Sequence, residues 1–502
     1  MRVVILTVCL VASTAHADDL FVGAGETYET IQDALDAATS GDVLTVRAGT
    51  YAESIRTRAD GITLQGEGEV LVQTEGRVLR IDHDDILVDG MIFDGEYGDA
   101  DAVTIEGSLV TLRNVEIRRA SRDCVDIRGA VRDIRIEESE IHHCLWSTEP
   151  NCSSGDCRDD AHGVVADQVA GLALVNTEIH AFSGDALQLN GRDQPTLWND
   201  IDIDGCTFWL EPLPEAEGGF AAGVVPGEDA IDTKTPDDIE GPGRLRVHNT
   251  VVFGLRNGLF ENISAFNMKE NVEVLFDRVT VYDTGIAFRL RGAGGRPRGA
   301  QATLRNVVVY DVDRAIRYED NIEPVVLQNI TLGAEIERFF QQASAPDDVV
   351  QSTNVLVLSD ALPDEATGAS NLAVGADAFV DAAGDNYRLA EGSPAVDQGE
   401  TVAAVTNDRD GMPRPSGSRY DIGAYERCED CAMDAGVDDG RADAGGRADA
   451  GGRADAGTAR DDGSAGDAGV PDEGGSGCGC SAAGAEAWWP ALFLLSLRRR
   501  RR

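Results

Sequence analysis

Short segments in which apolar and polar residues alternate recur along most of the chain. Segments such as VTLRNVEIRRA, LALVNTEIHAF and ATLRNVVVYDV each join two brief strands through an Asn turn. They return at intervals of roughly 20 to 25 residues, the range of a structural repeat. This pattern predicts an all-β fold, a right-handed parallel β-helix in which each coil stacks on the next. A β-sandwich also has many short strands, but it would not repeat one Asn turn at a fixed phase.

Both ends of the predicted β-helix have a candidate cap. Residues 31–38 read as an amphipathic helix with Ile31, Leu35 and Ala38 on one face, followed by a strand. This segment resembles the N-terminal caps of pectate-lyase-like β-helix proteins, in which a helix covers the open end of the first coil. Residues 393–426 resemble the C-terminal closure of secreted bacterial β-helix proteins. We therefore place the β-helix domain at residues 18–427.

The two termini suggest export. Residues 1–17 combine an early arginine, an apolar run and an Ala-His-Ala cleavage site, as in a secretory signal peptide. Residues 428–477 are rich in Gly, Ala, Asp and Arg and are predicted to be a disordered linker, because they cannot bury enough apolar surface to fold. Residues 478–502 carry two cysteines, the apolar run WWPALFLLSL and five arginines. This tail resembles myxobacterial sorting tails, which implies a secreted protein retained at the cell surface; an ordinary tail anchor is the alternative.

Charge and cysteine content narrow the possible partners. The formal net charge is -46, which disfavours binding to the polyanionic backbone of nucleic acids. An acidic glycan would need bound cations or a local basic strip. Cys144, Cys152 and Cys157 lie close together in sequence, and disulfide bonding explains them better than zinc in an exported chain. Cys428 and Cys431 could close a second small loop.

A second set of short strands lies between the Asn-turn strands and carries most of the candidate chemistry. In residues 227–236, GEDAIDTKTP, a strand would point Asp232 and Lys234 outward together and Ile231 and Thr233 into the core. The outward positions of this set are Asp123, Asp126, Arg128, His162, Asp167, Asp185, Gln188, Asn190, Asp229, Asp232, Lys234, Lys269, Arg289, Arg291, Arg317 and Glu319. Carboxylates therefore gather on the earlier coils and cations on the later ones. Since stacked coils lie about 4.8 Å apart, this order predicts an acid-to-base gradient along one groove.

The acidic part of this groove has the composition of a calcium site. Glu228, Asp229 and Asp232 offer the clustered carboxylate oxygens that Ca²⁺ prefers. Further along, Lys269 as a base and Arg289 form a candidate catalytic pair. Arg289 and Arg291 can hold sugar carboxylates in bidentate fashion, and Arg291, Arg317 and Gln188 are the candidate substrate-binding residues. Lys234 is a second candidate base, although its pairing with Asp232 is also compatible with a simple surface ion pair.

Asp185, the E-D-x-x-D run and the lysine of AFNMK together resemble polysaccharide lyase family nine, the calcium-dependent pectate lyases with a β-helix fold. The resemblance implies that Asp185, Glu228, Asp229 and Asp232 bind calcium and that Lys269 removes the proton. The chain departs from the family pattern in having Glu228 where Asp is usual. It also has a proline-containing insert after Asp185 and an additional cation at Lys234.

These features predict a monomeric lyase that cleaves an acidic, uronate-containing polysaccharide by calcium-assisted β-elimination. It would meet a membrane only through its C-terminal tail. A non-catalytic glycan-binding or structural β-helix, with calcium held for stability, is the main alternative. A hydrolase of the polygalacturonase type would use Asp126, Asp185 and Asp232. An alginate-type or chondroitin-type lyase would use Lys234 with Arg256.

Overall fold

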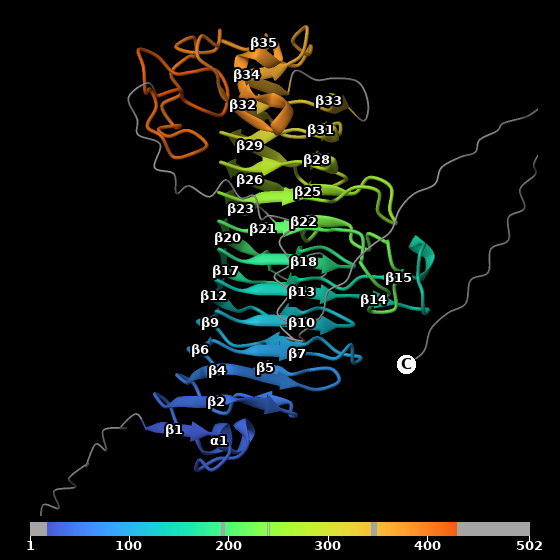
Figure 1. Cartoon of the computed structure of the whole chain (residues 1–502), viewed down its shortest axis with the longest axis vertical. Helices are drawn as coiled ribbons and strands as arrows, with labels where there is room; N and C mark the ends of the chain where they lie inside the picture. The colour runs from blue at the N-terminus through green and yellow to red at the C-terminus, as the bar shows by residue number, and fades with distance from the viewer. Residues whose placement is uncertain (1–17, 192–195, 238, 240, 343–348, 429–502) are drawn as a thin grey trace, which may run out of the picture. The chain divides into compact units, whose positions relative to one another are not determined.

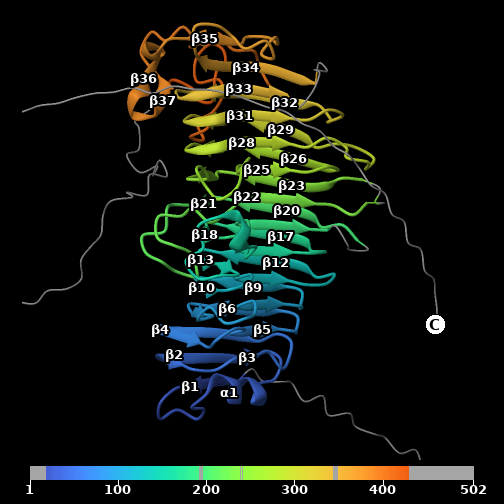
Figure 2. The same cartoon turned by 90° about the vertical axis from the view of Figure 1, so that its right-hand side faces the viewer.

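The computed structural model describes residues 18–428, apart from 192–195, 238, 240 and 343–348. Its coils stack on one another from β1 (Asp19–Val22) to β35 (Leu372–Val374), as Figures 1 and 2 show from two sides. Successive coils pair through parallel strands. The prediction of a right-handed parallel β-helix is confirmed. The signal peptide, the sorting tail and the linker beyond residue 428 lie outside the described residues.

The described strands form two long sheets and two short hairpins. An eleven-stranded sheet, called here the site sheet, holds β3 (Ile55–Arg56), β5 (Leu79–Ile81), β8 (Val103–Ile105), β11 (Val125–Ile127), β16 (Val164–Ala166), β19 (Leu187–Asn190), β22 (Asp229–Lys234), β25 (Ser264–Met268), β28 (Thr284–Leu290), β31 (Val312–Tyr318) and β33 (Ile336–Gln342). The hairpins are β14 (Trp146–Ser147) with β15 (Arg158–Asp159), and β36 (Phe379–Asp381) with β37 (Asn386–Leu389).

The second long sheet has 22 strands and supplies the other two strands of each coil. Before the Asn turn come β6 (Ile86–Asp89), β9 (Val110–Arg113), β12 (Arg132–Glu137), β17 (Ala170–Val175), β20 (Asn199–Asp204), β23 (Gly243–His248), β26 (Val272–Asp277) and β29 (Gln301–Arg305). After it come β7 (Ile92–Asp94), β10 (Glu116–Ala120), β13 (Glu140–Cys144), β18 (Glu178–Phe182), β21 (Thr207–Trp209), β24 (Val251–Phe253), β27 (Thr280–Val281) and β30 (Val308–Val309). The end coils add β1, β35 and four longer strands, β2 (Val43–Tyr51), β4 (Thr63–Gln73), β32 (Val325–Leu332) and β34 (Val350–Leu358).

The Asn turns have the conformation that makes the repeat visible in sequence. Asn114, Asn176, Asn249 and Asn306 all have a positive φ, between 47° and 52°. Asparagine tolerates this left-handed region better than most residues. The Asn306 amide also donates to the Asp277 carboxylate of the preceding coil at 2.9 Å. Each turn thus fixes both the bend of its own coil and its stacking on its neighbour.

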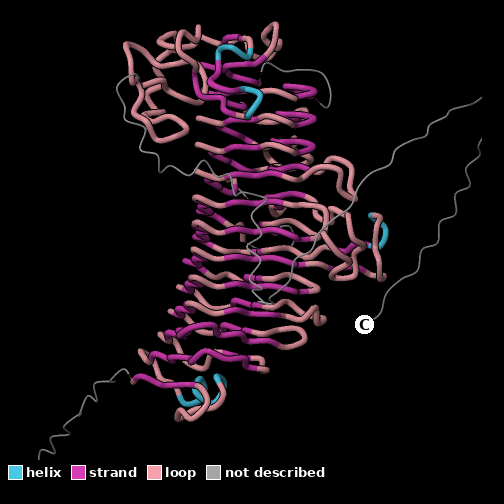
Figure 3. Tube along the Cα trace, viewed as in Figure 1, coloured by secondary structure: helices cyan, strands magenta, loops and turns pink. Residues whose placement is uncertain are grey.

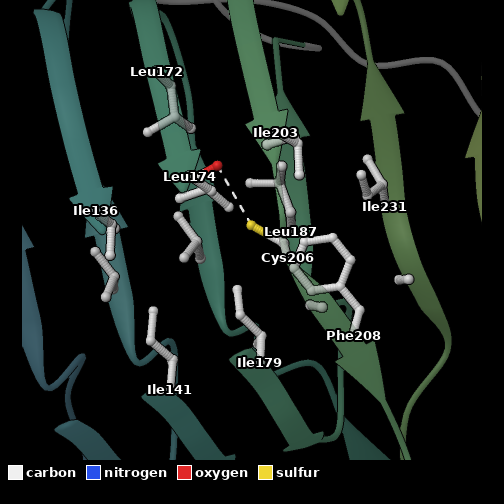
Figure 4. Packing of buried hydrophobic residues seen from close by; sticks show 14 of the residues in the cluster. Ile136, Ile141, Leu172, Leu174, Ile179, Leu187, Ile203, Cys206, Phe208 and Ile231 are labelled. Atoms are coloured by element: carbon white, nitrogen blue, oxygen red, sulfur yellow. Dashed lines mark hydrogen bonds between the residues drawn. The ribbon is translucent and has the colours of Figure 1, made fainter. Parts of the chain in front are cut away.

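The interior is a continuous apolar core that begins beneath the site sheet. Leu187 and Ile231 point inward from β19 and β22 and pack near Phe208 and Cys206 of the second sheet (Figure 4). The Cys206 thiol donates to the Leu174 carbonyl at 3.4 Å. Ile231 points into this core and Thr233 is fully buried, as predicted, but Asp232 is buried as well, with 3% exposure.

The predicted N-terminal cap is the helix α1 (Ile31–Ala37), which buries Ile31, Ala34 and Leu35 and contacts β1, β2 and β3. Thr30 caps it by accepting a hydrogen bond from the Asp33 amide at 3.1 Å. Short 3₁₀ turns occur at Gly155–Cys157, Ala376–Ala378 and Ala382–Gly384. Figure 3 shows how little of the described chain is helical. None of the described helices is long and apolar enough to cross a membrane.

Disulfides are present, as the cysteine pattern predicts. Cys152 pairs with Cys157 in the loop between β14 and β15. Cys144 does not belong to that loop: it ends β13 and pairs with Cys124, just before β11. Cys428 is also disulfide-bonded, while Cys431 lies outside the described residues.

Candidate functional site

A single outward column on the site sheet brings several predicted residues into line. The strand register places Gln188, Asp232, Asn267, Arg289 and Arg317 at equivalent positions on five successive coils. Since adjacent parallel strands lie about 4.8 Å apart, neighbours in this column are within reach of one ligand. The predicted order from carboxylates to guanidinium groups therefore follows the stacking direction.

A second column, at the start of the same strands, is a ladder of buried polar groups. The Asp123 carboxylate accepts from the His162 amide at 2.9 Å, and the His162 ring Nδ1 accepts from the Asp185 amide at 2.8 Å. The Asp185 carboxylate then accepts from the Asp229 amide at 3.1 Å. The Asp229 carboxylate accepts from the Ser264 amide at 2.9 Å. Each side chain thus satisfies the backbone of the next coil, which fixes its position.

Gly184 precedes Asp185 and Gly227 precedes Glu228, and both glycines allow neighbouring coils to approach closely. A Cβ atom on Gly184 would lie 2.3 Å from Nδ1 of His162. A Cβ on Gly227 would lie 2.6 Å from Leu210 and 2.8 Å from Phe182. Both distances are far below ordinary van der Waals contact, so larger residues would displace the neighbouring side chains. The Gly that precedes each acidic segment is therefore a packing requirement of the site.

Asp229 differs from the outward position expected for it. Its side chain is buried, with 1% exposure, because it has the same strand parity as the inward Ile231. The Asp229 carboxylate accepts from the Ser264 hydroxyl at 2.5 Å through Oδ1 and from the Asn267 amide at 2.9 Å through Oδ2. Both of its oxygens are engaged within the protein.

Asp232 lies at the centre of the outward column and faces both candidate lysines. Its Oδ2 accepts from Lys269 Nζ at 2.6 Å, and Lys234 Nζ lies 3.8 Å from the same oxygen. Its Oδ1 is buried and has no hydrogen-bond partner in the part of the chain that the structure describes. The next residue in the column, Asn267, also has a buried side-chain Oδ1 without a partner. Asn267 is a residue that sequence reasoning missed, although a polar side chain inside the apolar run AFNM was a usable signal.

Two further predicted site residues, Gln188 and Glu228, differ in their contacts and exposure. Gln188 donates to Asp185 Oδ2 at 2.9 Å, and both side chains are buried. Glu228 is more exposed, and its carboxylate lies 3.5 Å from Nη2 of Arg158. Arg158 follows the Cys152–Cys157 disulfide, so a loop distant in sequence reaches the acidic segment.

Burial and mutual repulsion act on the acidic residues together. Burial raises the pKa of Asp185 well above its usual range, and repulsion from Asp232 and Glu228 adds to the effect. Burial likewise raises the pKa of Asp229, with repulsion from Asp185 next. A bound cation would relieve this repulsion, and the unpaired Oδ1 atoms of Asp232 and Asn267 are the hard oxygen donors that Ca²⁺ selects. The residues present therefore fit a calcium ion.

The distances between candidate ligand atoms favour a different position for a metal ion. Among the residues that the structure describes, Asp101, Asp123 and Asp126 are the group whose ligand atoms all lie within 4.8 Å of one another. The four predicted ligands are not drawn together to that degree. However, the arginines Arg77, Arg122 and Arg128 surround Asp101 at 3.7, 3.6 and 2.6 Å. These arginines thus offset the charge of Asp101, although its Oδ1 is also buried without a hydrogen-bond partner among the described residues.

Arginines dominate the site sheet above Asn267. Arg291 pairs with Glu319 at 2.6 Å, and Arg317 donates to Asn262 at 2.5 Å. Burial lowers the pKa of Arg317, and the nearby Arg289 and Arg314 lower it further. The Nε atoms of Arg289 and Arg314 are buried without a hydrogen-bond partner. This concentration of positive charge, in a strongly acidic chain, suits an anionic ligand.

No protein-family model matches the chain, and no curated protein matches its sequence. Among solved structures, it is similar to the pectate lyase Pel9A, with a TM-score of 0.50 and 15% identity over 82% of this chain and 97% of that one. It is also similar to a rhamnogalacturonan lyase, with a TM-score of 0.47 and 9% identity over 73% and 91% of the two chains. An alginate lyase from Paenibacillus sp. str. FPU-7 gives a TM-score of 0.41 and 16% identity over 67% and 98%. At such identities the first match shows a shared fold, the pectate-lyase-like parallel β-helix.

Proposed function

We propose that this protein is a polysaccharide lyase-like enzyme that cleaves an acidic, uronate-containing polysaccharide by calcium-assisted β-elimination. The observation that carries the proposal is the column on the site sheet. There, buried oxygens of Asp232 and Asn267 without partners lie between two lysines and a strip of arginines. Such a surface suits a ligand that brings both a divalent cation and carboxylates.

Each part of the column has a role in this reaction. Asp185, Glu228, Asp229 and Asp232 would hold calcium, with Asp229 positioning its neighbours through its hydrogen bonds. Bound calcium would neutralise the uronate carboxylate and so acidify the adjacent C–H bond. Arg289, Arg291 and Arg317 would orient further carboxylates of the polymer, and Gln188 would contact the chain at the opposite end.

Lys269 is the preferred base, and Lys234 is the second candidate. The Lys269 ammonium donates to Asp232 at 2.6 Å, so it can act as a base only after this contact opens and the ammonium has released one proton to solvent. A cation bound by Asp232 would compete with the ammonium and favour that opening. The amine would then remove the proton beside the uronate carboxylate, and the C–H electron pair would form a C=C bond as the glycosidic C–O bond breaks. The leaving oxygen would take a proton from water or from the lysine ammonium just formed, and the product would be an unsaturated sugar.

The ion pair between Lys269 and Asp232 also supports a second candidate function. A lysine that permanently neutralises Asp232 would be structural, and the column would then bind a glycan, with calcium for stability and without catalysis. The two functions share the ligand and differ in whether a bond is broken.

The other catalytic schemes fit the geometry less well. Asp126 and Asp232 occupy the same column but are three coils apart, roughly 14 Å at the usual spacing, whereas paired glycosidase carboxylates lie within about 10 Å. Arg256 is held by Asp311 at 2.6 Å and Asp313 at 3.0 Å, away from Lys234.

The proposed setting of the protein is the cell exterior. Its disulfides suit an oxidising compartment, and the sequence suggests that the chain is secreted and retained at the surface through its C-terminal tail. We propose that it acts there as a monomer.

The test is an assay on polygalacturonate, alginate and chondroitin, with calcium or with a chelator, that follows absorbance of the unsaturated product. Calcium-dependent product on one of these polymers is the expected result. If no polymer yields product while calcium still raises the melting temperature, the lyase proposal fails and the non-catalytic function stands.

A further inference from the structure

We infer that Asn267 is a calcium ligand, whose side-chain oxygen works as a pair with Oδ1 of Asp232 on the preceding coil. This inference rests on the calcium site of the proposed function and adds a neutral ligand to its four carboxylates. Without a cation, the sheet would bury two acceptor oxygens that bind nothing.

The orientation of the Asn267 amide follows from its neighbour. Nδ2 donates to Asp229 Oδ2 at 2.9 Å. The reversed amide would set Oδ1 against that carboxylate, so Nδ2 must face Asp229 and Oδ1 must face elsewhere. Only 2% of the residue is exposed, and water therefore has little access to this oxygen.

The spacing of the two oxygens suits one metal ion. Asp232 and Asn267 are direct partners in the register of β22 and β25, so their side chains stand about one strand spacing, roughly 4.8 Å, apart. Calcium binds oxygen at about 2.3 to 2.6 Å, and an ion between the two side chains can therefore reach both. Amide oxygens are ordinary calcium ligands, whereas magnesium keeps more of its water.

The protein's own cations do not fill this role. Lys269 and Lys234 both approach Oδ2 of Asp232 and leave Oδ1 without a hydrogen bond. Arg289 follows Asn267 in the column, but its guanidinium makes no hydrogen bond to the amide. These two buried acceptors, which pair with none of the described residues, therefore point to a ligand from outside the chain.

The experiment measures calcium binding to the full-length protein by isothermal titration calorimetry, with magnesium as the comparison ion. We expect Asn267→Ala to weaken calcium binding at least tenfold. Ser264→Ala is the matched control, because Ser264 also donates to Asp229 but offers no unpaired oxygen to an ion. It should weaken binding less than threefold. Equal losses in the two variants would mean that Asn267 only positions Asp229, and would overturn the inference.

A second variant guards against misfolding of Asn267→Ala. Asn267→Asp keeps an oxygen at the site but loses the donor to Asp229. If Asn267 is a ligand, this variant should bind calcium at least as tightly as the unmodified protein. If Asn267 only positions Asp229, the variant should bind more weakly, which would reject the ligand role.

The inference and the proposed function can fail separately. Binding that depends on Asn267, without cleavage of any polymer, would support the ligand and reject the lyase. Cleavage and calcium binding that are unchanged in Asn267→Ala would support the lyase and reject the ligand. An unmodified protein that does not bind calcium would reject the inference together with the calcium step.

Discussion

Acidic and basic residues are arranged differently on the first coils and on the later coils of the site sheet. On its first coils, acids and bases alternate: Arg80 pairs with Asp82 at 2.6 Å and with Glu106 at 2.9 Å. Arg128 bridges Asp101 and Asp126 in the same way. On the later coils the charges are more separated, with Asp185 just before β19, Asp229 and Asp232 on β22, and guanidinium groups on β28 and β31. Lys269 still pairs with Asp232, and Arg291 with Glu319.

The difference indicates where a ligand is required. Alternating charges neutralise one another, so even the tight group of Asp101, Asp123 and Asp126 has little need of a metal. In the separated region, burial and repulsion from Asp232 and Glu228 raise the pKa of Asp185, and burial and repulsion from Arg289 lower the pKa of Arg317. In the alternating region, burial also raises the pKa of Asp126, but the adjacent Arg128 opposes this effect. A cation at the acidic end and a polyanion at the basic end would relieve the repulsion in the separated region. The four predictions below test this distinction.

The largest effect is expected for Lys269→Ala. A general base contributes about 10²- to 10⁴-fold to a reaction rate, so initial rates on the cleaved polymer should fall by that factor. Calcium should meanwhile bind more tightly, because the ammonium that contacts Asp232 is gone. Calorimetry and product absorbance measure the two effects. Lys234→Ala is the control, and a Lys269→Ala enzyme with full activity would refute the choice of base.

Asp232→Asn and Asp126→Asn compare the two arrangements directly. Calcium at a hundred times its Kd stabilises a protein by about 2.7 kcal/mol. Asp232→Asn should lose most of this gain, since Lys269 engages only Oδ2 of this carboxylate and Oδ1 has no partner among the described residues. Asp126→Asn should keep it, because Arg128 already pairs with that carboxylate. Thermal unfolding with calcium and with chelator measures both, and a loss confined to Asp126→Asn would assign the metal to the alternating region.

The role of the arginines on β28 and β31 can be tested by measuring the affinity of the protein for the polymer. Charge-assisted hydrogen bonds contribute about 1.5–3 kcal/mol, so Arg289→Ala should weaken affinity for the polymer at least tenfold. Arg289→Lys should restore only part of it, because lysine cannot bind a carboxylate in bidentate fashion. Arg80→Ala, in the alternating region, should have no effect on affinity. Similar losses for Arg80→Ala and Arg289→Ala would show that overall charge, and not this strip, attracts the polymer.

The β-helix fold and the outward column of the site could be predicted from the sequence, because both depend on short-range periodicity. The Asn turns repeat once per coil, and strand alternation correctly separated Asp232 from Ile231. Contacts set by loops or by stacking could not be obtained in this way. Arg158 reaches Glu228 from 70 residues away, and Asn267 gains its importance only from its place above Asp232. Asp229 follows the alternation rule, and its acidic neighbours obscured this in the sequence.

The smallest predicted effect is on the pH dependence of stability. Burial raises the pKa of Asp123 and Asp126 to about 6, and it also raises the pKa of Asp185 and Asp229. A carboxyl with a raised pKa holds a proton in the folded chain that the unfolded chain releases. Its contribution to stability is therefore complete below about pH 4 and is lost as the pH rises through the folded pKa.

The melting temperature in chelator should therefore fall by a few degrees between about pH 4 and pH 7. Calcium should remove the part that comes from Asp185 and Asp229, because a bound cation replaces their protons. It should leave the part from Asp126, which pairs with Arg128, and from Asp123, which accepts from the His162 amide. Asp126→Asn should flatten the remaining slope near pH 6, and Asp232→Asn should make the curves with and without calcium coincide. If the melting curves of the unmodified protein against pH were the same with calcium and with chelator, Asp185 and Asp229 would hold no metal ion. The early and late coils of the site sheet would then not differ in metal binding.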